Sequence, residues 1–287
     1  MTASTGYLER YLAGEHEQIW AELTALGAVV REEPLYHDAL AVARETMRRA
    51  RYNIELLVAR LQAVDFRFGP YEWDMPAYQA LLRSRPGAAE ANPGIFVLPK
   101  LHIEDQLAEV ERLGGVLPLS LRAWYEHIGS VCLVGNYPVA DPADPGGFTN
   151  NVQYRQARRQ ACGTYDLSSA EAWLAENEHD LDPLYVNPIE HALQQLRQWG
   201  HMYGDRQPVV VIAPDEFFKY GISGGGSYDI KLPNAGADAP LEGEWHRTAF
   251  VKYLRTCFAW GGFPGLEGKA HRPEDELAFL TRGLLPL

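Results

Sequence analysis

The sequence predicts an α+β fold in which a mainly antiparallel sheet packs against helices, and three stretches of its second half carry this prediction. Residues 209–212 form an unbroken apolar run, which is typical of a strand covered on both faces. In residues 228–232 apolar and polar side chains alternate, as in a strand with one face in water. Residues 250–258 carry apolar side chains at helical spacing, so one face of a helix is expected to pack on the strands.

Glycines and a threonine mark the ends of these elements. Three glycines at 224–226 stand directly before the second strand, and glycine adopts positive φ angles without steric cost. We therefore expect a tight reversal that makes the two strands antiparallel. Thr248 is expected to cap the start of the helix, and the glycines at 261 and 262 are expected to end it.

The first 66 residues predict a helical extension that precedes this domain. Apolar residues recur at steps of three and four between Leu8 and Val30, and Gly27 breaks the pattern. A long helix is expected from about Leu35 to Val64, with an apolar seam whose steps alternate between four and three. The seam consists of Tyr36, Leu40, Ala43, Met47, Ala50, Ile54, Leu57 and Leu61. It is interpreted either as the contact of an antiparallel hairpin with the preceding helix or as a homodimer seam.

Residues 67–102 lack periodicity and contain repeated prolines, so they predict a connecting segment. Residues 103–287 form the predicted α+β domain. Within it, further helices are expected at about 103–114, 118–128, 170–178, 189–199 and 273–283, and a strand is expected to begin at Val131. The turn-rich stretch 138–151 lacks the alternating oxygen ligands of a calcium loop.

The composition is that of a globular protein, and its charge limits the partners. The chain has 287 residues, of which 46% are hydrophobic and 22% charged, and its formal net charge is -12. This charge argues against binding to nucleic acid or to anionic membranes, because phosphates attract clustered lysine and arginine. The arginines between positions 44 and 51 are therefore expected to pair with Glu45 and Glu55 on a wet helix face rather than with phosphate.

The sequence predicts neither membrane insertion nor export. It lacks an apolar run of about 18 residues, and its N-terminus lacks a basic start followed by an apolar block. Cys132, Cys162 and Cys257 are odd in number and far apart, which predicts reduced thiols and a cytoplasmic protein. Cys132 and Cys257 have apolar neighbours and are expected in the core.

One string resembles a catalytic motif. Residues 221–225 fit the pattern G-x-S-x-G, with Ser223 as the nucleophile of a serine hydrolase. The triad would be completed, in the chain order of such hydrolases, by Asp229 or Asp238 and then by His246 or His271. The serine of such a motif lies where a strand passes into a helix, whereas the residues after these glycines alternate as a strand. The glycines are therefore interpreted as a turn, and the hydrolase is kept as an alternative.

The remaining polar residues show no pattern of a metal or cofactor site. The nine histidines include no H-E-x-x-H motif, and the chain contains no C-x-x-C. The glycine run lacks the lysine of a phosphate loop, and no G-x-G-x-x-G is present. We therefore predict no catalytic, cofactor-binding or metal-binding residues.

The order of features in residues 103–265 resembles the SMI1/KNR4 (SUKH) family. The stretch EDQLAEVERLGGVLPLSLRAWYEHIGSV has the family's helix with a glutamate, Leu-Pro pair, helix with aromatic residues and glycine turn. These positions are filled by Glu109 or Glu111, Leu117-Pro118, Trp124-Tyr125 and Gly129. The later run PVVVIAPDEFFKYGISGGGSYDIKLP is similar to the family's strand, aspartate, glycine-rich turn and strand, and FVKYLRTCF to its last helix. The resemblance leaves residues 1–99 unexplained.

This resemblance implies a non-enzymatic α+β domain that binds another protein. Bacterial members of the family are often immunity proteins that neutralise a toxin, and fungal members are regulatory scaffolds. No catalytic or ligand residues carry over. An acidic chain would suit a basic toxin such as a nuclease, through electrostatic steering.

We expect the partner surface among the polar residues that flank the glycine-rich turn. These residues are Asp215, Lys219, Ser223 and Asp229. Two alternatives to the binding module remain: the serine hydrolase at Ser223, and an oligomeric structural protein assembled through the seam between Tyr36 and Leu61.

Overall fold

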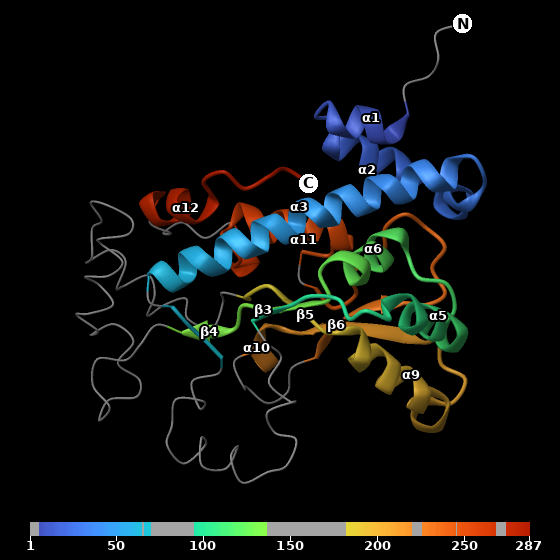
Figure 1. The fold of residues 1–287 in the computed structure, drawn as a ribbon. Helices are drawn as coiled ribbons and strands as arrows, with labels where there is room; N and C mark the ends of the chain where they lie inside the picture. The colour runs from blue at the N-terminus through green and yellow to red at the C-terminus, as the bar shows by residue number, and fades with distance from the viewer. Residues whose placement is uncertain are drawn as a thin grey trace, which may run out of the picture.

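The structure is a computed structural model, and it describes residues 6–64, 66–69, 95–136, 182–219, 226–244, 246–267 and 274–287. These residues form a mixed α+β fold with small antiparallel sheets (Figure 1). The α+β prediction is confirmed, although helices rather than a sheet make up most of the described chain. The predicted loop 138–151, the predicted helix 170–178 and Cys162 lie outside the described residues.

The N-terminal part consists of helices. These are α1 (Tyr7–Leu12), α2 (His16–Ala25), the 3-10 helix η1 (Gly27–Arg31) and α3 (Leu35–Ala63). The helical prediction and the extent of the long helix are confirmed, and Gly27 has a positive φ of 55° at the expected break. The chain also breaks between α1 and α2, where the spacing predicts no break.

The seam of α3 is buried inside the chain. From Leu40 to Leu61 every seam residue is at most 7% exposed, whereas Tyr36 is half-buried. The helix packs mainly against α6 (Leu119–His127), and also against α1 and α12 (Glu274–Thr281) (Figure 1). The seam is thus an intramolecular contact, with α6 rather than the preceding helix as its main partner. A homodimer through α3 would have to use residues outside the seam.

Three of the arginines between positions 44 and 51 pair with Glu45 or Glu55, as expected. The pairs within the helix are Arg48–Glu45, Arg49–Glu45 and Arg51–Glu55, at N–O distances of 2.7, 2.8 and 2.9 Å. Arg44 instead reaches Glu126 of α6, with 2.7 Å between Nε and Oε2. Exposed pairs such as Arg51–Glu55 contribute only about 0.5 kcal/mol each, so the apolar seam is expected to dominate the stability of this helix.

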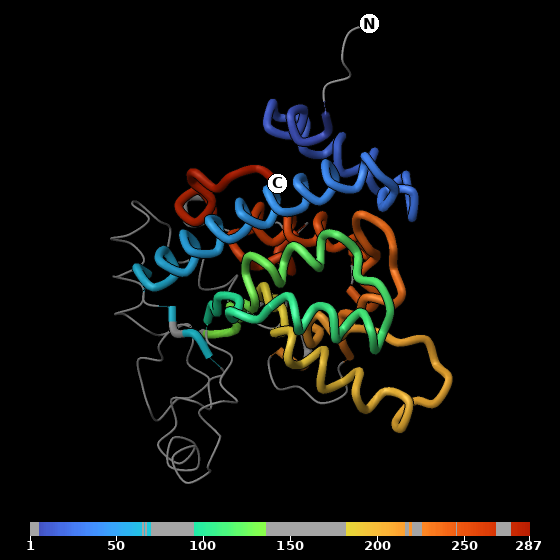
Figure 2. The backbone as a smooth tube through the Cα atoms, turned by 45° about the vertical axis from the view of Figure 1, so that its right-hand side comes forward, coloured from blue at the N-terminus to red at the C-terminus, as the bar shows by residue number. Residues whose placement is uncertain are grey.

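The C-terminal segment returns to the middle of α3 (Figure 2). The amide of Asn53, a buried residue of α3, donates to the main-chain oxygen of Leu285 at 2.8 Å. The amide oxygen of Asn53 accepts from the main-chain nitrogen of Leu285 at 2.7 Å. These two bonds satisfy a buried polar side chain and hold the last residues on the helix.

The strands are short, and all their pairings are antiparallel. They are β1 (Arg67–Phe68), β2 (Phe96–Val97), β3 (Ser130–Cys132), β4 (Gly135–Asn136), β5 (Tyr185–Val186), β6 (Val209–Pro214) and β7 (Ser227–Lys231). Their order is β2-β3-β5 in one sheet, and β6 pairs with β7 and β1 with β4. β5 lies beside β6, because Asn187 donates from its main-chain nitrogen to Ile212 at 2.6 Å and from its amide to Val211 at 3.1 Å. The strand expected at Val131 is β3, whereas β2 and β5 are too short to show a period in the sequence.

The central strand pair agrees only partly with the prediction. In β7, Tyr228 and Ile230 are buried and their neighbours are not, which confirms one wet face. In β6, Val210 and Ile212 are buried while the other two valines are half-buried, so the expectation of full cover on both faces is wrong. Between the strands lies an additional helix, α10 (Glu216–Lys219), where a tight hairpin is expected. The rest of the connection, residues 220–225, lies outside the described residues.

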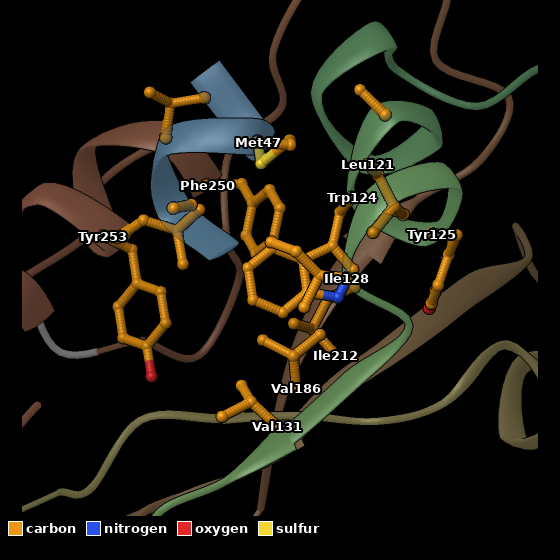
Figure 3. Packing of buried hydrophobic residues seen from close by; sticks show 14 of the residues in the cluster. Met47, Leu121, Trp124, Tyr125, Ile128, Val131, Val186, Ile212, Phe250 and Tyr253 are labelled. Atoms are coloured by element: carbon orange, nitrogen blue, oxygen red, sulfur yellow. The ribbon is translucent and has the colours of Figure 1, made fainter. Parts of the chain in front are cut away.

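The core joins the N-terminal helices to the strands (Figure 3). Trp124 of α6 is fully buried and packs edge-to-face on Phe250 of α11 (Phe250–Ala259), with 5.5 Å between the ring centroids. Met47 of α3 lies on one side of this pair, and Ile212 of β6 lies on the other (Figure 3). One hydrophobic cluster therefore contains residues of both the predicted extension and the predicted main domain.

Three further helices are found where the sequence predicts them, namely α5 (Ile103–Gly114), α6 and α9 (Ile189–Tyr203). The glycines that end α5 and α6 have positive φ angles, 93° at Gly115 and 83° at Gly129. A β-carbon at Gly129 would lie 2.5 Å from the main-chain oxygen of Val97. This position therefore requires glycine both for its backbone conformation and for the close approach of β2.

The start of α11 corrects the predicted cap. The N-cap residue is Ala249, and the hydroxyl of Thr248 instead donates to Glu244 at 3.3 Å. The main-chain nitrogen of Val251 in the first turn donates to Oδ2 of Asp238 at 3.1 Å, so a distant carboxylate supplies the cap. The glycines at 261 and 262 have positive φ angles and end the helix, as predicted.

The helices of the described residues include none with the length and apolarity needed to cross a bilayer. Cys132 and Cys257 are both buried, which confirms their expected place in the core. The last predicted helix is confirmed as α12, with Leu280 fully buried.

Candidate functional site

The predicted partner surface lies at the connection between β6 and β7. The structure describes Asp215, Lys219 and Asp229 at the two sides of this connection, and Ser223 lies outside the described residues. The three described residues play different structural roles.

Asp215 binds the main chain on both sides of the connection between β6 and β7. Its Oδ1 accepts a hydrogen bond from the main-chain nitrogen of Phe218 at 2.9 Å, which is the geometry of a helix N-cap. Its other carboxylate oxygen accepts from the main-chain nitrogen of Gly226, just before β7. One side chain thus holds both the start of α10 and the return of the chain into β7.

Lys219 is not an exposed residue, and the expectation that it lies on the surface is wrong. Its side chain is 0% exposed and forms an ion pair with Asp182, which is 1% exposed. The ammonium group also lies 4.7 Å from the ring centroid of Tyr228 in β7. Burial of a lysine requires such partners, because an unpaired charge in the interior is strongly destabilising.

Around this ion pair the side chains are aromatic or carry a thiol. The rings of Tyr228 and Tyr253 meet edge-to-face, with 6.1 Å between their centroids. Burial raises the pKa of Tyr253 and of Cys257 well above their usual values, and the negative charge of Asp182 adds to both shifts. At neutral pH the thiol and the phenol are therefore neutral, which is unfavourable for nucleophilic attack by Cys257.

Asp229 lies on the partly solvent-exposed face of β7. Its main chain forms a bridge with Glu242, with N–O distances of 2.9 and 2.8 Å in the two directions. Burial raises the pKa of Asp229; a hydrogen bond with Ser227 lowers it, and the nearby Glu242 charge raises it. Asp229 is half-buried, as is Asp215, and Oδ1 of Asp229 is buried.

The structure adds one residue to this surface. Phe218 of α10 is 49% exposed, and it lies between the capping Asp215 and the buried Lys219. Phe218 is absent from the predicted surface because that prediction includes only polar residues that flank the glycine-rich turn. Asp215 directly before Glu216 is a helix N-cap signal that indicates the short helix.

Two described members of the alternative hydrolase triad, Asp238 and His246, contact residues from other parts of the chain. Asp238 is buried and accepts from the Ser120 hydroxyl at 2.7 Å, in addition to capping α11, and burial raises its pKa to about 6. His246 lies between two carboxylates, with Nδ1 2.5 Å from Glu244 and Nε2 2.7 Å from Glu267. Ser223 and His271 lie outside the described residues.

The part of the chain that the structure describes contains no group of three or more His, Cys, Asp or Glu side chains placed to hold a metal ion. Comparison with known proteins gives no match: no family model, no curated protein and no solved structure resembles this chain closely enough to be assigned. The resemblance to the SMI1/KNR4 family therefore depends on the motif residues of the sequence.

Proposed function

We propose that this chain is a non-enzymatic protein-binding module of the SMI1/KNR4 kind, with neutralisation of a toxin domain as its biological role. In this proposal the chain works in the cytoplasm, and it requires no cofactor. Regulation of another protein by the same kind of contact is a second form of this proposal.

The order of elements in the second half of the chain is the main support. α5 carries Glu109 and Glu111, and it is followed by Leu117-Pro118, α6, the turn at Gly129 and β3. Further on, β6 is followed by Asp215, β7 and α11. This order of the described elements supports the proposal, while most of the glycine-rich turn of the motif lies outside the described residues.

The chemistry of the surface between β6 and β7 also supports a protein partner. Phe218 exposes half of an aromatic ring, and the carboxylate of Asp229 lies on the adjoining strand. Exposed aromatic side chains are frequent anchors of protein interfaces. The net charge of -12, to which Asp229 contributes, would attract a basic partner and increase its association rate.

The test starts from the gene that neighbours the one encoding this chain. We expect its product to be toxic when expressed alone, and co-expression of this chain to restore growth. The purified proteins are expected to bind, as measured by calorimetry. The variant Phe218→Gln should weaken binding at least about fivefold, because an anchor residue commonly contributes more than about 1 kcal/mol.

A matched variant controls for the loss of an exposed apolar side chain. Met202 at the end of α9 is 59% exposed and distant from α10 in the chain, so Met202→Gln should leave the affinity unchanged. Equal weakening by both substitutions would reject the surface, and a neighbouring product that neither harms cells nor binds would reject the immunity role. Labelling of Ser223 by a fluorophosphonate, with esterase turnover, would replace the proposal with the hydrolase.

A further inference from the structure

The C-terminal tail, residues 282–287, is held by side chains that bind its main chain. The tail runs antiparallel to α3, because Arg60 near the end of this helix meets the start of the tail and Arg49 meets a residue near its end (Figure 2). These hydrogen bonds use main-chain atoms of the tail, so they do not require particular side chains on it. They join Arg60 to residues 280 and 282, Asn53 to residue 285, Arg49 to residue 286 and Arg255 to residue 287.

The residues of α3 that bind the tail lie on one face of the helix. Positions 49, 53 and 60 are separated by four and seven residues, which are close to one and two helical turns. Asn53 binds both the nitrogen and the oxygen of one tail residue, while Arg49 donates to the oxygen of Pro286 at 3.1 Å. From α11, Nε of Arg255 donates to the oxygen of Leu287 at 2.9 Å. We call the surface formed by Arg49, Asn53, Arg255 and Phe258 the tail groove.

One apolar side chain anchors the tail in this groove. Leu287 is only 4% exposed, whereas Leu284 and Leu285 are half-buried and the other side chains of the tail are exposed. Phe258 of α11 lies in the wall of the same cavity as Leu287. Main-chain hydrogen bonds combined with a pocket for selected side chains are the usual division of roles in peptide recognition, in which the bonds give affinity and the pocket gives specificity.

The tail does not fill the space beside it. A cavity of about 620 Å³ remains between the tail, α11 and the start of α2. Its lining carries charges of both signs, from Glu15, Glu17 and Arg255, so an uncharged segment fits it better than an anion or a cation. The lining contains no residue of α10 or β7, so this place is distinct from the proposed partner surface. A segment bulkier than the tail therefore has room in the groove.

The tail is also able to detach by itself. Its exposed side chains contribute little to the core, and α12 before it keeps its own anchor, because Leu280 is fully buried. Segments with few buried apolar contacts open locally, without unfolding of the whole molecule. Release of the tail would leave the side chains of the tail groove free to bind another main chain.

We propose that the tail groove is a peptide-binding site, which the tail closes in the free chain and from which a segment of a partner protein displaces it. This segment is uncharged, presents main-chain oxygens to Arg49, Asn53 and Arg255, and places a leucine-like side chain beside Phe258. The site goes beyond the proposed function, because it does not involve the surface between β6 and β7.

The test uses a labelled peptide of residues 282–287, RGLLPL, and fluorescence anisotropy on the full chain. With the unaltered chain, binding should be weak, because the tethered tail competes at an effective concentration in the millimolar range. The variant Leu287→Gln removes the anchor of the tail and leaves the groove intact. It should bind the peptide at least about tenfold more tightly than the unaltered chain does.

Two controls are matched to this variant. Arg282→Gln changes an exposed side chain of the same tail, so it should leave the affinity for the peptide at the level of the unaltered chain. A second peptide, with Gln in place of the last leucine, should bind the Leu287→Gln chain at least about tenfold more weakly than RGLLPL. Equal binding of the two peptides, or no binding of RGLLPL to this variant, would overturn the proposal.

Hydrogen exchange of the unaltered chain tests the proposal even if Leu287→Gln fails to fold. The amide hydrogen of Leu285, which is bonded to Asn53, should exchange faster than those in the middle of α3, because the tail detaches locally. Millimolar RGLLPL should accelerate this exchange by keeping the groove occupied, whereas the peptide that ends in Gln should not. Exchange at the rate of the α3 amides, or equal effects of the two peptides, would contradict a displaceable tail.

Discussion

The contact between α3 and α6 and the site beneath α10 show two different ways of burying side chains. The first is an apolar seam that contains Met47 and Trp124, with ion pairs such as Arg51–Glu55 left in water. The second places an ion pair, Lys219–Asp182, inside the protein under the ring of Tyr228. The α3 seam follows a regular period in the sequence, whereas the ion pair joins residues that are 37 positions apart.

The difference determines how each region tolerates substitution. Burial of apolar surface contributes stability in proportion to the area removed from water, so the loss is shared among many side chains. A buried ion pair is close to neutral while intact, but it becomes strongly destabilising when one partner is removed. We therefore expect removal of a single charge to be strongly destabilising at the buried ion pair and nearly neutral at the exposed pairs of α3.

The largest effect is expected for Lys219→Met. The substitution leaves the carboxylate of Asp182 buried without its cation, and it should lower the free energy of unfolding by about 3 to 5 kcal/mol. Urea denaturation followed by circular dichroism measures this change. The double variant Lys219→Met with Asp182→Asn should recover most of the loss, since Asn is neutral and tolerates the positive φ of 43° at this position. A loss below about 1 kcal/mol for the single variant would show that water reaches the pair.

An intermediate, pH-dependent effect is expected for Asp238→Asn. Burial raises the pKa of Asp238 from 3.8 to about 6, so between these values the folded protein holds a proton that the unfolded chain has lost. The free energy of unfolding should therefore fall as the pH rises through this window, by up to about 3 kcal/mol. Asn does not titrate in this range. Denaturation of both proteins at pH 4 and pH 7 gives the change in the free energy of unfolding with pH for each. The difference between these two changes is the contribution of Asp238. Parallel pH profiles would contradict the assignment.

The smallest effect is expected for Arg51→Gln. Both side chains of the Arg51–Glu55 pair are at least 40% exposed, so the pair is screened by water and salt. Its removal should change the free energy of unfolding by less than about 0.5 kcal/mol, with the same result at 0.05 and 0.5 M salt within error. A change comparable to that of Lys219→Met would remove the distinction between the two regions.

The parts of the fold that the sequence predicts well are those with a long period. The extent of α3, its buried seam and the alternation of β7 follow from spacing alone, because a face that meets the core repeats at fixed steps. α10, β2 and β5 are too short for a period to appear, so they are absent from the prediction.

The site is less predictable than the fold, because its geometry depends on partners that are distant in sequence. Lys219 looks like an ordinary polar residue of a turn until Asp182 is placed beside it. Likewise, Thr248 stands where a cap is expected, yet the carboxylate that caps α11 comes from Asp238. No local pattern encodes these contacts, whereas the cap at Asp215 is visible in the sequence once a short helix is considered.

The cover that α3 provides for α6 has a consequence for how the chain opens. Amide hydrogens on both helices are expected to exchange with solvent only when the whole molecule unfolds, since neither helix can separate without exposing Trp124. A protease that cuts between residues 69 and 95 should accordingly leave two pieces that remain associated. The two fragments should separate only in denaturant.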